Sequence, residues 1–156
     1  MPYNGAKVKR DRAALAQAII RAKTQGMDYG DPLIEWRQTS GYGPRVHPVT
    51  GKPHMHTGVD LAAAQGDPVF ATEDGVITQA QHHSGSPIRG NQVTVKHADG
   101  RETRYQHLER FGEAALKGGR VRKGDVLGYV GRTGRATGPH LHYGMYEGGR
   151  PRNPFG

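Results

Sequence analysis

From residue 66 onward, short runs of β-branched and aromatic residues alternate with glycine, aspartate and asparagine. This pattern is typical of many short strands joined by tight turns. Five such runs lie at 67–72, 75–81, 91–97, 101–108 and 125–131. The third and fourth are separated by Ala98-Asp99-Gly100, and Asp-Gly is a strong signal for a β-hairpin. We therefore predict a mainly β fold, built as a compact antiparallel sheet or sandwich.

The first 34 residues differ from this pattern. Apolar residues at helical spacing in the segment 11–26, among lysines and arginines, predict a short basic α-helix. We therefore predict two units, a basic helical N-terminal extension at 1–34 and a domain at 35–156. The helix would pack its apolar stripe on the domain, contact an anionic envelope surface, or bind nucleic acid. A short strand is expected over Glu35–Thr39.

Charge and composition narrow the classes of partner and of site. The net charge of +8 favours a polyanionic partner, but the few aromatic residues are scattered, so we expect no nucleic-acid partner. The chain has no cysteine, which excludes disulfides and thiolate metal sites. Any metal must be held by His, Asp or Glu.

Two fragments carry such ligands. In His140-Leu141-His142 the strand period places both imidazoles on one face, and His56 and Asp60 are four residues apart. Two imidazoles and one carboxylate are a donor set that catalytic zinc accepts. His54 also belongs to an HxH pair with His56, so it remains an alternative ligand that the spacing to Asp60 disfavours.

A third fragment is the segment RETRYQHL at 101–108. Simple strand alternation places Thr103, Tyr105 and His107 on one face, with Tyr105 expected in the core. The other histidines, His47, His82, His83 and His97, are interpreted as turn or surface residues. Asp74 and Asp125 stand in Asp-Gly or Gly-Asp pairs and are predicted to be turn residues.

Taken together, HTGVD at 56–60, YQHL at 105–108 and GPHLH at 138–142 resemble the lysostaphin-like (LytM-type) zinc endopeptidases that cut peptidoglycan. The resemblance runs from about Gly43 to Pro154 and includes GPRVHPVTGK and VRKGDVLGYVGRTGRATGPHLHYGM. It departs from the family in an additional SGSPIR segment, in Tyr143 where Phe is frequent, and in the N-terminal 30 residues, which fall outside it.

This resemblance implies a LytM-type peptidase domain at 35–156 that binds one Zn²⁺ per chain. The implied zinc ligands are His56, Asp60 and His142, and the implied catalytic residues are His107 and His140. Asn91, Tyr42 and Arg45 are implied or expected to contact substrate. The ligand set leaves a site charge of +1, which suits a Lewis acid, and the two further histidines would transfer protons, in an order that the sequence leaves open.

The function that follows is hydrolysis of peptide bonds in peptidoglycan cross-links or stem peptides by a monomeric, bacteriolytic metalloprotease. A catalytically silent wall-binding or regulatory protein of the same type is the alternative. The interrupted apolar residues at 13–20 do not resemble a signal peptide. We therefore expect an antimicrobial phage endolysin or virion-associated lysin that acts on the wall or periplasm, made in the host cytoplasm and released during lysis. A cell-envelope enzyme stripped of its leader is the alternative.

Overall fold

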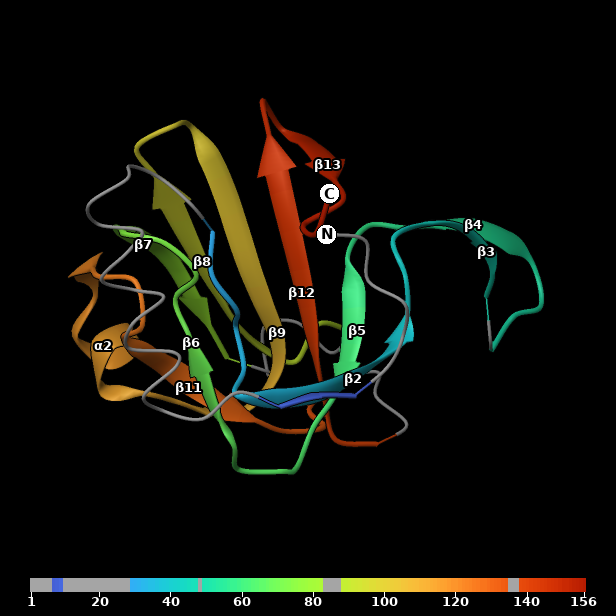
Figure 1. Ribbon diagram of the computed structural model, residues 1–156, viewed down its shortest axis with the longest axis horizontal. Helices are drawn as coiled ribbons and strands as arrows, with labels where there is room; N and C mark the ends of the chain where they lie inside the picture. Colours follow the sequence, from blue (N-terminus) through green and yellow to red (C-terminus); the bar gives the residue numbers. More distant parts are fainter. Residues whose placement is uncertain (1–6, 10–28, 48, 83–87, 135–137) are drawn as a thin grey trace.

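The computed structural model describes residues 7–9, 29–47, 49–82, 88–134 and 138–156, and β-strands dominate them (Figure 1). The helix predicted within residues 11–26 lies outside the described residues. A short helix, α2 (Glu113–Lys117), lies between β9 and β10. In chain order the strands are β1 (Lys7–Lys9), β2 (Glu35–Ser40), β3 (Gly43–Val46), β4 (Pro53–His56), β5 (Val59–Ala62), β6 (Pro68–Phe70), β7 (Gly75–Gln81), β8 (Asn91–His97), β9 (Arg101–Phe111), β10 (Gly119–Val121), β11 (Val126–Val130), β12 (His140–Glu147) and β13 (Arg150–Arg152).

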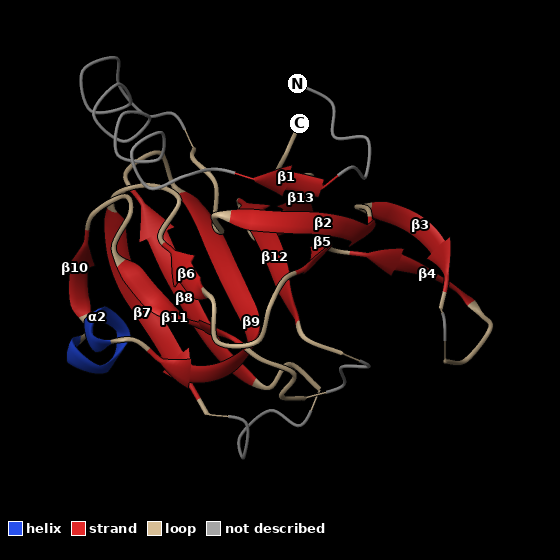
Figure 2. Cartoon of the chain, turned by 60° about the horizontal axis from the view of Figure 1, so that its bottom comes forward, coloured by secondary structure: helices blue, strands red, loops and turns tan. Residues whose placement is uncertain are grey.

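The strands form one large antiparallel sheet and a separate hairpin. The main sheet has the order β1-β2-β5-β12-β9-β8-β7-β10, while β11 pairs with β6 and β9, and β13 pairs with β12. Figure 2 shows the long strands β7, β8, β9 and β12 lying side by side. The hairpin of β3 and β4 projects from one side of the body, next to β5 (Figure 1). The predicted antiparallel β class is therefore confirmed.

Local sequence explains where the strands turn. The predicted hairpin joins β8 to β9, and Gly100 adopts a φ of 89° while its N–H donates to the His97 carbonyl. Glycine tolerates this left-handed conformation because it lacks a Cβ. Among the described residues, no helix has the length and apolar character that a membrane span requires.

The register assigns each long strand one core face and one outer face. Tyr143 pairs with Tyr105, and Tyr105 pairs with Val93, so these three side chains share the core face. All three are almost completely buried, as the core prediction for Tyr105 requires. His142 pairs with Gln106 and therefore belongs to the opposite, outer face. Packing on the core face thus fixes the strands, while the outer face carries polar side chains.

A chain of buried hydroxyl groups crosses this core. Tyr143 Oη lies 2.8 Å from Thr72 Oγ1, which lies 3.0 Å from Tyr105 Oη. Tyr105 Oη is 2.8 Å from Thr103 Oγ1, and that oxygen is 2.7 Å from His97 Nε2. This hydroxyl chain ties β12, which carries the GPHLH motif, to the central strands.

The prediction that His97 is a turn or surface residue is wrong. Its side chain is buried, and its Nδ1 donates to the Asp74 carbonyl over 2.8 Å. The sequence pattern missed this because His97 is the last residue of β8, where the turn begins but the core still continues. Burial lowers the pKa of His97 below its ordinary value of 6.5, although the Asp74 carbonyl partly opposes the shift.

This pKa shift predicts that the folded protein becomes less stable as the pH is lowered. Because the folded-state pKa is lowered, the unfolded chain binds the proton first as pH falls through 6.5. The free energy of unfolding then falls by at most about 1.4 kcal/mol per pH unit until the folded pKa is reached. In urea titrations, we expect the stability difference between wild type and His97→Gln to shrink from about pH 7.5 to about pH 5. A constant difference would contradict this role.

Candidate metal centre

Three potential metal ligands converge at the junction of β4, β5 and β12. His56 ends β4, Asp60 lies in β5, and the antiparallel register places Asp60 directly opposite His142 of β12. One ligand atom from each residue lies within 4.8 Å of the others. The fragments that were predicted to come together are 82 positions apart in the chain, and sheet pairing joins them. His54, the alternative ligand, does not belong to this group.

The carboxylate of Asp60 is held between the two imidazoles. Its Oδ1 is 2.9 Å from His142 Nδ1, and its Oδ2 is 3.4 Å from His56 Nε2. Burial by itself raises the pKa of Asp60, but the hydrogen bonds of His142 and His56 outweigh burial and hold that pKa well below its usual range. Asp60 is therefore an anion near neutral pH.

His142 faces Asp60 with Nδ1, and His56 faces it with Nε2. His56 Nδ1 donates to the Gly41 carbonyl over 2.7 Å, which leaves Nε2 directed to the carboxylate. Burial lowers the pKa of His142, with the Asp60 carboxylate opposing this, so the ring is neutral near pH 7. One carboxylate and two imidazoles form a donor set that suits a divalent cation.

The backbone before Asp60 packs directly on the His142 ring. A Cβ at Gly58 would lie 2.7 Å from His142 Nε2 and 2.7 Å from the Tyr143 carbonyl oxygen. Since a real Cβ does not approach these atoms so closely, glycine is required here. Gly58 was not among the predicted site residues, although its place inside HTGVD is a signal that could have identified it.

Two more histidines lie beside this group. His140 is two residues before His142 on β12, and the His140 ring centroid is 4.7 Å from that of His107. The His107 ring is also 6.3 Å from that of His142. All five predicted metal and catalytic residues therefore gather in one place.

His107 reaches this place through a β-bulge, which corrects the simple alternation predicted for residues 103–107. Asn91 pairs with Leu108 and Val93 pairs with Tyr105, so two residues of β9 lie opposite a single residue of β8. His107 takes a φ of 66°, a left-handed conformation that is uncommon for residues other than glycine. Instead of joining Tyr105 on the core face, His107 turns to the outer face.

Hydrogen bonds to neighbouring backbone stabilise the bulge. The His107 N–H donates to the Arg89 carbonyl over 2.9 Å, and His107 Nδ1 donates to the Thr133 carbonyl over 2.6 Å. The Thr133 hydroxyl donates to the Leu108 carbonyl over 2.7 Å and accepts the Asn91 N–H over 3.1 Å. Thr133 therefore fixes the carbonyl that orients His107.

In both His107 and His140, Nδ1 contacts a backbone carbonyl, while Nε2 has no hydrogen-bond partner among the described residues. Burial lowers the pKa of His107 to about 4, with the Thr133 carbonyl opposing the shift and His140 and His142 adding to it. His140 Nδ1 is 2.9 Å from the Gly138 carbonyl oxygen. In a neutral ring whose Nδ1–H is donated, Nε2 carries a lone pair and can accept a proton.

The three residues expected to contact substrate each have a partner within the chain. Asn91 Nδ2 donates to the carbonyls of Leu108 and Glu109. The Tyr42 hydroxyl donates to the Pro151 carbonyl over 3.0 Å. These bonds fix both side chains, and their contact with substrate stays a prediction.

Arg45 belongs to β3 of the hairpin, and its side chain extends toward the metal ligands. Its guanidinium donates to Ser40 Oγ and to His54 Nε2, the latter over 2.8 Å, and lies 3.7 Å from Asp60 Oδ2. Arg45 is thus directed toward the ligand group, and its contact with substrate also stays a prediction.

The sequence of this chain is similar to those of known peptidases. Residues 54–154 match the model of peptidase family M23. The chain is 48% identical over 124 residues to the DD-carboxypeptidase/endopeptidase Mpg of Neisseria meningitidis, covering 80% of this chain and 27% of that protein. The chain thus spans about a quarter of the length of this curated relative.

Two solved structures of peptidases are also similar to this chain. A zinc containing peptidase from Vibrio cholerae has a TM-score of 0.66 at 39% identity, covering 75% of this chain and 35% of that chain. The catalytic domain of lysostaphin from Staphylococcus simulans has a TM-score of 0.65 at 31% identity, covering 77% of this chain and 90% of that chain.

Proposed function

Because the chain belongs to peptidase family M23, we propose that it is a zinc-dependent endopeptidase that hydrolyses peptide bonds in peptidoglycan cross-links or stem peptides. The observation that carries this proposal is the convergence of three ligand atoms within 4.8 Å, with two further imidazoles beside them. The matched relative is named as a DD-carboxypeptidase/endopeptidase, which supports a peptidase acting on the cell wall.

The donor set fits zinc, with His56, Asp60 and His142 as the proposed ligands of one ion. Two imidazoles and an ionised carboxylate are the ligand types that zinc takes in catalytic sites, and no thiolate is needed. Zinc in such a site supplies Lewis acidity and lowers the pKa of water to about 7. The Gly41 carbonyl supports this role because it fixes the tautomer of His56, as outer partners of metal ligands commonly do.

His107 and His140 are the proposed proton carriers. With a pKa of about 4, His107 is neutral near pH 7, and its Nε2 can accept a proton from water. His140 offers the same nitrogen from the strand that carries His142. One of them would act as base, and the other would stabilise the oxyanion or protonate the leaving amine. The order of these roles stays open.

The direct test uses purified, cross-linked peptidoglycan and reads the products by mass spectrometry. We expect cleavage by the protein as purified, loss with EDTA, recovery with zinc, and no cleavage by a folded His140→Ala variant. The fragment masses would identify the scissile bond. Stoichiometric zinc binding with no change in any muropeptide would favour the catalytically silent, wall-binding alternative instead.

The route to the wall is a separate proposal. A phage-type lysin would reach peptidoglycan from inside the host or from the virion, and its basic N-terminal extension would contact an anionic envelope surface. Such an enzyme should lyse chloroform-permeabilised Gram-negative cells and leave intact cells unharmed. Equal lysis of both would contradict this proposal.

Thr133 provides a sharper test of the role of His107. Thr133→Val keeps the side-chain shape but leaves the Leu108 carbonyl and the Asn91 N–H without their hydroxyl partner. We expect kcat to fall roughly tenfold because His107 loses its fixed orientation, with little change in zinc affinity. Steady-state kinetics and chelator competition would measure both. Thr133→Ser retains the hydroxyl and should restore kcat, and failure to do so would argue against this positioning role.

A further inference from the structure

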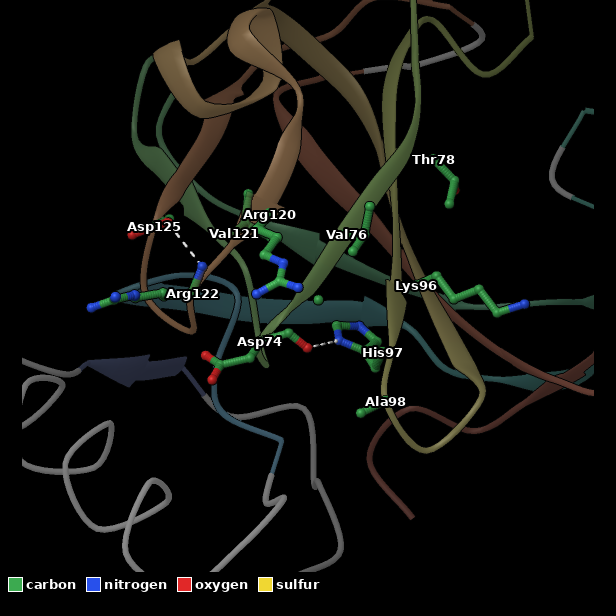
Figure 3. Close-up of a pocket in the computed structure, with 11 residues that line it drawn as sticks. Asp74, Val76, Thr78, Lys96, His97, Ala98, Arg120, Val121, Arg122 and Asp125 are labelled. Carbon is green, nitrogen blue, oxygen red and sulfur yellow. Dashed lines mark hydrogen bonds between the residues drawn. The ribbon is translucent and has the colours of Figure 1, made fainter.

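A cavity of about 870 Å³ lies at the far edge of the main sheet, where β7, β8 and β10 meet (Figure 3). Its lining includes Val76, Lys96, Arg120 and Arg122. Arg120 extends over the middle of the cavity, while Lys96 and Arg122 lie at opposite sides of it (Figure 3). We call this the basic cavity.

The basic cavity is separate from the metal centre but lies on the same face of the sheet. His142 pairs with Gln106, and side chains two residues apart on β9 share one face, so Glu102 belongs to the face of His142. Glu102 pairs with Lys96, and Lys96 pairs with Val76. Val76 in turn pairs with Arg120. This outer face therefore continues from the metal centre to the cavity over a distance on the order of 20 Å.

Ion pairs within the described residues do not neutralise the cations that line the cavity. Among the described residues, Lys96, Arg120 and Arg122 form no ion pair, whereas Arg101 and Arg152 both contact Glu147. The charges of the first group therefore remain available to a ligand.

The two carboxylates in the cavity wall both accept hydrogen bonds from the backbone of the segment between β10 and β11. Asp74 Oδ1 accepts the Lys123 N–H over 2.7 Å, and Asp125 Oδ2 accepts the Arg122 N–H over 2.9 Å. The Asp125 bond lies within one turn, as predicted for this residue, whereas the Asp74 bond joins two segments that are 49 positions apart. Each carboxylate keeps its negative charge, so three cations and two anions line the cavity, and these five side chains have a net charge of +1.

Between the cations the cavity floor is apolar. Val76, the second residue of β7, is 45% exposed, and the buried Val121 of β10 also lines the cavity. An apolar floor beneath separated cations suits an extended chain with small apolar groups and spaced carboxylates. The stem peptides of peptidoglycan, with their alanine methyl groups and free carboxylates, have this chemistry.

We propose that the basic cavity is an exosite that binds a carboxylate-bearing stem peptide of peptidoglycan away from the scissile bond. This proposal rests on the proposed function, because the same polymer is the substrate. Occupation of the cavity would hold the enzyme on the wall while a neighbouring cross-link enters the metal centre. It would act on the affinity for the intact polymer and not on the chemical step.

The test compares charge reversals at two exposed arginines that form no ion pair with any other described residue. Arg120→Glu alters the cavity, and Arg150→Glu on β13 makes the same change in net charge elsewhere. Sedimentation with purified sacculi measures binding, and a soluble cross-linked muropeptide dimer measures cleavage. For Arg120→Glu we expect binding to weaken about fivefold and Arg150→Glu to stay within about twofold, with the difference lost at high salt. Cleavage of the soluble dimer should be equal in all three proteins.

Each other outcome has a definite meaning. Equal weakening by both variants would overturn the exosite and leave a general effect of net charge. Slower cleavage of the soluble dimer by Arg120→Glu would also overturn it, because the cavity would then act on the metal centre. If the wild type cannot cleave the dimer, the proposed function fails, whereas the sedimentation arm still decides whether the cavity binds the wall. Lys96→Gln gives a second, milder variant that should weaken sacculus binding in the same direction.

Discussion

His107→Ala is expected to lower kcat on peptidoglycan by about 10²–10⁴-fold while the protein stays folded and binds zinc. The reason is geometric. The His107 ring lies 4.7 Å from that of His140 and is neutral near pH 7, so its loss removes a proton carrier without removing a proposed ligand. Steady-state kinetics on a soluble muropeptide dimer and metal analysis would measure the two effects separately.

The control for this variant is His82→Ala, because His82 is exposed and lies outside the group of histidines around the metal centre. It should leave both kcat and zinc content unchanged. A His107→Ala enzyme with wild-type kcat would assign the proton transfers to His140 and solvent. Loss of zinc from His107→Ala would instead mean that His107 supports the ligand group.

Gly58→Ala should have a comparably large effect through packing alone. Its added Cβ would meet His142 Nε2 and the Tyr143 carbonyl, both at 2.7 Å, and the carbonyl belongs to the backbone of β12. The ring must therefore rotate away from Asp60 or the strand must shift. We expect zinc affinity to fall by about 10–100-fold or more, with activity falling in parallel at limiting zinc. Chelator competition would measure this change.

The fold offers a matched control in Gly144→Ala. A Cβ at Gly144 would lie 3.5 Å from its nearest neighbours, which is an ordinary contact distance. Both variants add one methyl group near the same strand, and only the one at Gly58 should affect the metal. Equal zinc affinity in the two variants would show that the turn at Gly58 adapts.

Sequence patterns predicted the ligand group because its geometry depends on regular features. A period of two along β12 places His140 and His142 on one face, and the spacing from His56 to Asp60 spans a single tight turn. Sheet pairing then brings Asp60 opposite His142. The five metal and catalytic residues were identified by a family resemblance that the M23 match confirms, while their individual roles stay predictions.

Irregular features could not be predicted in this way. The face on which His107 lies depends on one additional residue in the β8–β9 pairing, and nothing in the RETRYQHL pattern marks that bulge. The burial of His97 depends likewise on tertiary packing at a strand end, where a turn signal is the stronger local pattern. The N-terminal helix remains a prediction, since its residues lie outside those described.

The hydroxyl chain in the core has a direction, and its members are therefore unequal. Each hydroxyl has a single hydrogen, and His97 donates through Nδ1, so a neutral ring must accept from Thr103. Every donation then runs from Tyr143 toward His97. Tyr143 stands at the donor end, where phenylalanine would leave only an unused acceptor behind. Tyr105 stands in the middle and also accepts the backbone N–H of Thr72, so the same change there would leave both Thr72 donors without an acceptor and Thr103 without a donor. The two tyrosines that pair across the sheet therefore differ sharply in how freely evolution can remove their oxygen.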